Sequence, residues 1–206
     1  MTTSEQTKEI YNMIAPEFDL YRVKVWPCVR NFLKNCNNTQ LILDIGCGNG
    51  KNIVGNPHLN IMGIDFSEKL VEICKNKNLN VMLANMTSIP YKDNTFNNFI
   101  AIASYHHLDN EIDRKCALNE MYRVLENGGT GLIVVWAMEQ GDRSKFKFTK
   151  NDEIVMWKSP NNIVYNRYYH IYRKGELAEE ITRLEPRFNV IDEYWEKGNW
   201  VITLQK

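Results

Sequence analysis

Two hydrophobic patterns alternate along the chain. Short uninterrupted apolar runs are typical of buried parallel strands, whereas apolar residues three and four positions apart are typical of amphipathic helices. The runs predict strands at the LILDI segment that begins at Leu41 and over Ile61–Asp65, Val81–Ala84, Phe99–Ser104 and Leu132–Trp136. Because these strands alternate with helical segments, we predict a parallel sheet covered by helices on both faces.

The helical spacing also predicts where helices begin and end. We expect helices over Ser4–Ile14, from Pro27 onward, after the cap residue Ser67, over Glu111–Leu125 and over Glu176–Leu184. Pro16 is expected to end the first helix, because an internal proline removes a helical hydrogen bond. Gly128 and Gly129 are expected to stop the helix that reaches Leu125.

The C-terminal pattern changes to strict alternation. Val190–Trp195 and Trp200–Leu204 alternate around Lys197-Gly198-Asn199, which predicts a β-hairpin. We therefore predict an α/β fold with a mostly parallel seven-stranded sheet, a C-terminal antiparallel hairpin and N-terminal helices. A terminal hairpin of this kind differs from the dehydrogenase arrangement.

Length and composition are those of one globular domain. The chain has 206 residues, of which 44% are hydrophobic and 11% aromatic, far too many aromatics for disorder. No apolar run approaches the roughly 18 residues of a membrane span. The polar, acidic N-terminus MTTSEQTKEI does not resemble a secretory signal. We expect a cytoplasmic protein with no membrane partner.

Cysteine spacing and charge distribution indicate which kinds of site the chain can form. The five cysteines include no C-x-x-C pair, so we predict neither a disulfide scaffold nor a metal site. The formal net charge is zero, but 141–175 holds eight basic and three acidic residues, a local charge of +5. This basic segment, which includes Arg143, is a candidate contact for RNA phosphates, with a solvated surface loop as the alternative.

The sharpest local signal is the glycine-rich segment after the first strand. Gly46, Gly48 and Gly50 follow a G-x-G-x-G spacing, and such glycines allow a tight turn and a close approach of a ligand. A dinucleotide fingerprint would need glycine at position 51, where this chain has Lys51. An NAD-dependent dehydrogenase is therefore disfavoured.

The segment D-x-G-C-G-N-G, with Asp65 closing the next strand, resembles the class I methyltransferases that use S-adenosylmethionine. The resemblance implies their Rossmann-like fold and this cofactor. It implies that Gly46, Gly48 and Gly50 surround the methionyl part of the cofactor. It also implies that Asp44 holds the ammonium group, directly or through water, and that Asp65 binds the ribose.

The same resemblance assigns further cofactor-binding residues. Many relatives place an Asp after the third strand for the adenine amino group, and this chain has Asn85 there, whose oxygen can accept the same bond. Met86 is expected to pack beside the base. The other residues implied as cofactor contacts are Cys47, Phe66 and Ala103.

Longer segments resemble one family within that class. They are EIYNMIAPEFDLYRVKVWPCVRNFL, YHHL, VVWAMEQG and RYYHIYRKGEL. They are similar to the tRNA methyltransferases that esterify 5-carboxymethyluridine at the wobble position, which implies a tRNA anticodon loop as the partner. We expect one methyltransferase domain over 1–206, with a helical lid over 1–38 and a core over 39–206 that carries the basic insertion at about 141–175.

Methyl transfer to a carboxylate places specific demands on the enzyme, whatever family the chain resembles. A carboxylate with a reference pKa near 4 is ionised at neutral pH, so methyl transfer needs no general base. The enzyme must orient the acceptor, and a cation should hold its spare oxygen. Arg22, with Lys24 as a second candidate, precedes the second helix and is our hypothesis for this cation, with a solvated charge pair as the alternative.

Other acceptor-side candidates follow later strands. His106 and His107 come after the fourth strand, and we favour His106 as a hydrogen-bond donor, with a structural histidine as the alternative. Trp136 ends the fifth strand, where it can stack a splayed base or pack in the core. By resemblance, the substrate and RNA contacts are Arg167, Tyr169, His170 and Arg173.

Family members commonly act with a small zinc-containing activator protein, and the third strand, Val81–Ala84, is its candidate docking edge. Two other functions remain open from the residues alone. One is a small-molecule methyltransferase on the same fold, which the glycine loop permits. The other is a non-catalytic binding subunit, against which the intact glycines and acids argue.

Overall fold

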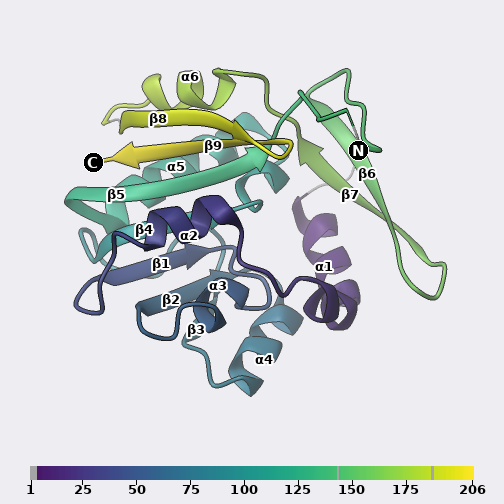
Figure 1. Cartoon of the computed structure of the whole chain (residues 1–206), viewed down its shortest axis with the longest axis horizontal. Helices are drawn as coiled ribbons and strands as arrows, with labels where there is room; N and C mark the ends of the chain where they lie inside the picture. Colours follow the sequence, from purple (N-terminus) through teal and green to yellow (C-terminus); the bar gives the residue numbers. More distant parts are fainter. Residues whose placement is uncertain (1–3, 143, 187) are drawn as a thin grey trace.

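A seven-stranded sheet lies at the centre of the computed structural model, which describes residues 4–142, 144–186 and 188–206 (Figure 1). The strands are β1 (Leu41–Ile45), β2 (Asn60–Asp65), β3 (Val81–Leu83), β4 (Phe96–Ile102), β5 (Leu125–Trp136), β8 (Asn189–Glu196) and β9 (Asn199–Gln205). Their order is β3-β2-β1-β4-β5-β9-β8, and the first five are parallel. β9 pairs antiparallel with β5 and β8, which confirms the predicted fold class.

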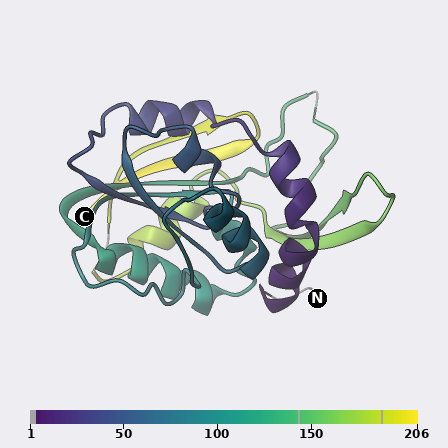
Figure 2. The ribbon, with the colours of Figure 1, turned by 90° about the horizontal axis from the view of Figure 1, so that it is seen from below.

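Helices cover both faces of this sheet because its central strands are apolar on both sides. Leu43 faces the cluster that includes α5 (Glu111–Val124) and α6 (Glu176–Thr182), whereas Ile42 faces the cluster that includes α2 (Pro27–Leu33). Figure 2 shows α2 and α5 on opposite sides of the sheet. The shorter helices between strands are α3 (Lys51–Val54) and α4 (Glu68–Asn76).

The first helix is longer than the sequence predicts. α1 extends over Ser4–Tyr21, and the expectation that Pro16 ends it is wrong. Ile14 and Ala15 are buried against α4, and this packing outweighs the ~3 kcal/mol that an internal proline costs. Within the described residues, no helix is long and apolar enough to cross a membrane.

The helix after β4 ends earlier than predicted, and the next strand begins earlier. α5 ends at Val124, and β5 already starts at Leu125, so Gly128 and Gly129 lie in a strand rather than ending a helix. The reason is pairing with the C-terminus: the amide of Gly128 donates to the carbonyl of Lys206, and the amide of Lys206 donates to the carbonyl of Gly129. Long-range hydrogen bonds therefore decide this boundary.

The basic insertion folds into a separate two-stranded sheet that the sequence analysis did not predict. β6 (Asp152–Lys158) pairs antiparallel with β7 (Val164–His170) and projects from the molecule beside α1 (Figures 1 and 2). Trp157 and Tyr165 on this hairpin pack against the apolar cluster of α1. Arg143, counted in the basic segment, lies outside the described residues.

Other predicted elements are confirmed with small shifts of their ends. Ser67 caps α4 by accepting a hydrogen bond from the amide of Leu70. The C-terminal hairpin turns at Lys197 and Gly198, both with positive φ, as expected for a two-residue hairpin loop. The five cysteines are free thiols.

Candidate functional site

A cavity of about 320 Å³ lies where the parallel strands end. The loops after β1 to β4 and the end of β5 line one side, and α1 and β7 line the other. This strand edge is where open α/β sheets bind ligands. The predicted site residues that line the cavity are Arg22, Gly46, Cys47, Gly48, Asp65, Phe66, Asn85, Met86, Ala103, His106, Trp136, Arg167 and Tyr169. Five predicted residues do not: Lys24, Asp44, Gly50, His170 and Arg173.

The glycine loop is shaped by close neighbours. Gly46 has φ +70°, and a Cβ there would lie 2.4 Å from the Cβ of Ser104, so no side chain fits. Gly48 has φ +57° and faces Phe18 of α1. Gly50 does not line the cavity, and a Cβ there would meet Cδ1 of Leu79 at 2.3 Å. Its role is to begin α3 in the left-handed conformation.

Asp65 stands at the end of β2 with both carboxylate oxygens engaged. Oδ2 accepts a hydrogen bond from the amide of Gly48 at 2.8 Å, and Oδ1 accepts one from the amide of Ser67 at 2.9 Å. Burial raises the pKa of Asp65 to about 6, although these amides oppose the shift. Each oxygen keeps a further lone pair for a hydroxyl donor from a ligand.

Asp44 lies beneath the loop and is fully buried. Its Oδ2 accepts a bond from Nδ2 of Asn52 at 3.1 Å. Within 4–142, 144–186 and 188–206, neither Oδ1 of Asp44 nor Oδ1 of Asn52 has a hydrogen-bond partner. Burial raises the pKa of Asp44 to about 7. Asn52 lines the cavity, whereas Asp44 does not line it and is hydrogen-bonded to Asn52. Two orphaned oxygens suit a cationic ligand group, and the sequence analysis missed Asn52.

The adenine-side residues lie along the rim and the wall. Asn85 is exposed, and its Oδ1 already accepts a bond from the amide of Thr87 at 3.1 Å. Ala103 has φ +53°, a conformation that is strained for a residue other than glycine. Its amide donates to the carbonyl of Val134 at 2.8 Å, which anchors the turn after β4.

The two histidines differ in their bonding. Nε2 of His107 accepts from the hydroxyl of Tyr11 at 2.8 Å, and its Nδ1 donates to the carbonyl of Tyr168 at 2.9 Å. Nδ1 of His106 accepts from the amide of Trp136 at 3.1 Å, and its Nε2 has no partner in the part of the chain that the structure describes. Because an amide can only donate, the proton of neutral His106 is on Nε2. His106 therefore keeps a free donor, and His107 keeps none.

Burial lowers the pKa of both imidazoles. The pKa of His107 falls to about 3, and the pKa of His106 falls well below its usual value, because burial and the nearby His107 and Arg167 disfavour its charged form. Both histidines are neutral at physiological pH, and both are weak bases.

An aromatic cluster forms the far wall. The ring of Trp136 stacks on Tyr169 with centroids 4.5 Å apart, and Phe146 lies 5.1 Å from the same indole. One face of Trp136 is thus covered by this chain's own Tyr169. Tyr11 and Phe18 also line the cavity from α1. The predicted helix end at Ile14 leaves out Phe18, whereas Tyr11 lies inside the predicted helix and no local pattern marks it as a cavity residue.

Arg167 is the buried cation of the cavity. Only 5% of its surface is exposed, and its guanidinium lies over the rings of Tyr11 and Tyr169. Nη1 donates to the hydroxyl of Tyr11 at 3.2 Å, and Nε has no hydrogen-bond partner among the described residues. Among the residues that the structure describes, no carboxylate pairs with it. The positive charge is therefore uncompensated.

Arg22 and Lys24 are placed differently from Arg167 and from each other. Both side chains are exposed, but Arg22 lines the mouth of the cavity and Lys24 does not. Nδ2 of Asn49 in the glycine loop donates to the carbonyl of Arg22 at 3.2 Å and to Oδ1 of Asp19 at 2.9 Å. These bonds fix the C-terminal end of α1 to the glycine loop.

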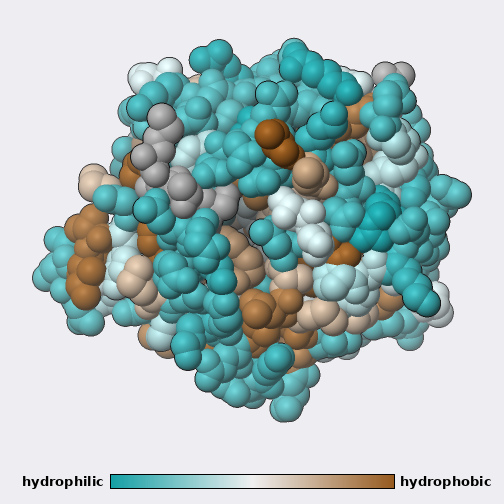
Figure 3. Space-filling model, turned by 180° about the vertical axis from the view of Figure 1, so that it is seen from behind, coloured by the Kyte–Doolittle hydropathy of each residue, from teal (hydrophilic) through white to brown (hydrophobic). Residues whose placement is uncertain are grey.

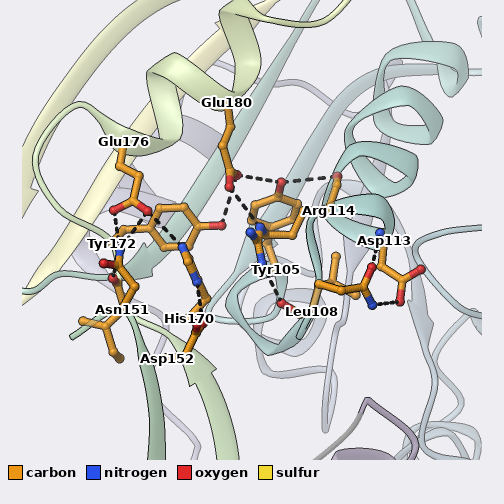
Figure 4. Close-up of polar contacts among 12 residues, drawn as sticks. Tyr105, Leu108, Asp113, Arg114, Asn151, Asp152, His170, Tyr172, Glu176 and Glu180 are labelled. Atoms are coloured by element: carbon orange, nitrogen blue, oxygen red, sulfur yellow. Dashed lines mark hydrogen bonds and ion pairs between the residues drawn. The ribbon is translucent and has the colours of Figure 1, made fainter.

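His170 and Arg173 are not brought to the cavity, contrary to expectation. Nδ1 of His170 lies 3.0 Å from Oδ1 of Asp152, and Nε2 lies 3.0 Å from Oε1 of Glu176 (Figure 4). Successive side chains of a strand point to opposite faces, so His170 and Arg167 on β7 face opposite ways. Arg173 is exposed beyond the strand.

Comparisons with known proteins agree with this geometry. Residues 43–133 match the Methyltransferase domain family. The chain is 33% identical to the tRNA (carboxymethyluridine(34)-5-O)-methyltransferase of Schizosaccharomyces pombe over 98% of its own length and 97% of that protein. The chain belongs to this tRNA methyltransferase family. It is accordingly an S-adenosylmethionine-dependent methyltransferase.

Relatives in this family differ in length. The chain is 30% identical to the alkbh8 protein of Xenopus tropicalis, which carries the same enzyme name, over 98% of this chain but 41% of that protein. A methyltransferase of Haloferax volcanii, solved in complex with the Trm112 methyltransferase activator, superposes with a TM-score of 0.66 at 13% identity. The superposition covers 95% of this chain and 96% of that chain. At this identity it shows only that the two chains share a fold.

Proposed function

We propose that this protein transfers the methyl group of S-adenosylmethionine to the carboxylate of 5-carboxymethyluridine at the wobble position of a tRNA anticodon, forming the methyl ester. The observation that carries the proposal is the uncompensated guanidinium of Arg167 inside the cavity. The names of the two relatives above state the same reaction for those proteins.

The residues at the strand edge fit the cofactor. The backbone at Gly46 and Gly48, the unpartnered oxygens of Asp44 and Asn52, and the carboxylate of Asp65 would hold its methionyl, ammonium and ribose parts. When bound, S-adenosylmethionine supplies an electrophilic methyl group on a sulfonium. Phe66, Asn85, Met86, Ala103 and Cys47 complete the lining on this side.

Arg167 selects an anionic acceptor. A charge buried without a counter-ion costs several kcal/mol, and an incoming carboxylate removes much of that cost. The planar guanidinium also matches a carboxylate bidentately, which fixes the acceptor's orientation. Arg22 at the mouth adds a second cation on the route into the cavity. We do not retain Lys24 as a carboxylate ligand, because it does not line the cavity.

The acceptor side suits a nucleophile that is already ionised. His106 carries its proton on Nε2 and can donate a hydrogen bond, but it cannot take a proton at that atom. The low pKa of His107 and its two hydrogen bonds make it a structural residue. A hydroxyl or amine acceptor would need a base here, whereas a carboxylate needs only placement.

The partners follow from two exposed features. Lys145, Lys147 and Lys150 are exposed on the basic segment and supply positive charge for tRNA phosphates. β3 is an edge strand with Met82 and Leu83 exposed, and we propose it as the docking edge of a small zinc-containing activator.

The test is replacement of Arg167 by methionine, which preserves length but removes charge. We expect esterification of tRNA that carries 5-carboxymethyluridine to fall at least about 100-fold, since hydrogen bonds to charged groups are among the strongest. Nucleoside mass spectrometry would measure the ester, and calorimetry should find cofactor affinity within about twofold of wild type.

The matched variants are Arg167→Lys, which keeps the charge without the bidentate geometry, and Lys24→Ala, which alters a nearby exposed cation. Arg167→Lys should retain partial activity and Lys24→Ala nearly full activity. Wild-type turnover by Arg167→Met, or a methylated product that is not the ester, would refute the assignment.

A further inference from the structure

A second depression lies directly beside the cavity. It has a volume of about 620 Å³ and lies between the C-terminal half of α1 and the turn end of the β6–β7 hairpin. Figure 2 shows these two elements side by side. The lining of this groove is Ile14, Glu17, Phe18, Tyr21, Arg22, Trp157, Lys158, Ser159, Pro160, Asn162 and Arg167.

The groove shares part of its wall with the cavity. Phe18, Arg22 and Arg167 line both depressions. These three side chains border both the cavity and the groove. A polymer with one residue in the cavity would pass them to enter the groove. The next residue of such a polymer would therefore reach the groove.

The chemistry of the groove suits a nucleotide. Tyr21 is 65% exposed although it is an aromatic residue, and the half-buried indole of Trp157 lies nearby in the lining. Arg22 and Lys158 add exposed positive charge, against the single acid Glu17. Aromatic rings together with cations are what proteins use to bind single-stranded nucleic acid, by stacking bases and pairing with phosphates.

The wall formed by the hairpin turn is held in place. The amide of Ser159 donates to the carbonyl of Ile163 at 2.8 Å, and the hydroxyl of Ser159 accepts from the amide of Ile163 at 3.1 Å. Ser159 is itself buried. A preorganised wall lowers the entropy cost of binding a flexible strand.

We propose that this groove binds the nucleotide adjacent to the target uridine, with its base on Tyr21 and its phosphate near Arg22 and Lys158. The inference rests on the proposed function, since it takes RNA as the acceptor polymer. A protein partner is less suited, because the exposed apolar residues of the hairpin, Ile154, Met156, Ile163 and Val164, do not line the groove. Figure 3 shows hydrophobic surface gathered on this projecting arm.

The test compares acceptors of different length. The full chain would be assayed with the nucleoside 5-carboxymethyluridine and with a trinucleotide that carries it in the middle. Wild type should give a kcat/KM for the trinucleotide at least about tenfold above that for the nucleoside, the size of one stacked base. Tyr21→Ala should remove most of that gain and leave the nucleoside value unchanged.

Three controls make the comparison specific. Tyr21→Phe keeps the ring and should keep the gain. Leu20→Ala alters the neighbouring residue on α1, which is 71% exposed and lines neither depression, and should change nothing. Lys158→Ala should lower kcat/KM for the trinucleotide but not for the nucleoside. This decrease should be smaller at high salt, as expected for a phosphate contact.

Binding of a fluorescent trinucleotide, measured by anisotropy, separates this inference from the proposed function. Suppose that no acceptor is methylated, but Tyr21→Ala weakens trinucleotide binding about tenfold and Leu20→Ala does not. The groove inference is then supported and the proposed reaction is refuted. If methylation occurs but Tyr21→Ala affects nucleoside and trinucleotide equally, the groove inference is overturned. Unchanged RNA binding together with a wild-type dimer that Tyr21→Ala dissociates would also overturn it, in favour of a second copy.

Discussion

Asp65 shows how one buried side chain serves both the loop and the ligand. Its two oxygens hold the amides of Gly48 and Ser67, and so fix the glycine loop against the start of α4. The same carboxylate lines the cavity where the ribose of the cofactor is expected. Burial opposes its ionisation and raises the pKa of this carboxyl from near 4 to about 6.

This pKa makes cofactor affinity depend on pH. As pH rises from 5 to 8, Asp65 with a pKa of about 6 loses its proton and becomes a better acceptor for hydroxyl donors, so affinity should increase. Asp65→Asn should bind about tenfold more weakly at pH 8 and show a flatter pH profile by calorimetry. Any remaining slope belongs to Asp44, and an unchanged slope in Asp65→Asn would contradict the role given to Asp65.

At the scale of elements, α1 connects the cofactor side to the acceptor side. Because it continues past Pro16, it places Phe18 against Gly48 and its C-terminal end against Asn49. Earlier on the same helix, the hydroxyl of Tyr11 contacts both His107 and Arg167. The helix therefore positions the acceptor-binding residues relative to the loop that holds the methyl donor.

The edge strand β3 carries the prediction about the activator. Met82 is 42% exposed on an unpaired edge, and Met82→Asp should strongly reduce co-purification with a co-expressed activator, because a charge disfavours an apolar strand interface. Val54→Asp, which alters a residue on α3 that is 55% exposed, is the matched control and should co-purify normally. Equal recovery with both variants would place the activator elsewhere.

At the scale of the whole molecule, a partly buried polar network attaches the β6–β7 hairpin to the body. His170 contacts Asp152 and Glu176, while Arg114 of α5 donates to Glu180 of α6 (Figure 4). The hydroxyls of Tyr105 and Tyr172 donate to the same Glu180. The network supports the strand that presents Arg167 to the cavity, so it stabilises the site without lining it.

This network predicts how stability varies with pH. Burial alone would lower the pKa of His170, but its bonds to Glu176 and Asp152 outweigh burial and raise it. A raised folded pKa contributes stability that is complete below the unfolded value of about 6.5 and is lost as pH rises through the folded value. His170→Gln should therefore lower Tm more at pH 5.5 than at pH 8.5.

Thermal unfolding of wild type, His170→Gln and His58→Gln at both pH values would measure this difference. His58 is an exposed histidine, and its replacement should leave Tm nearly unchanged. A deficit in His170→Gln that grows with pH would show that the ion pairs do not hold the proton on His170.

Sequence patterns alone were enough to predict the strands of the seven-stranded sheet, the glycine loop and the acid that ends β2. These features are local, because apolar runs, turn residues and a short motif carry them within a few positions. The tertiary structure decided which charges meet the acceptor. Arg167 and His170 are three residues apart on one strand, and only its pleat and the packing of α1 turn one into the cavity and the other into the network. The true ends of α1 at Tyr21 and of α5 at Val124 were likewise decided by contacts between segments distant in the chain, which no local pattern contains.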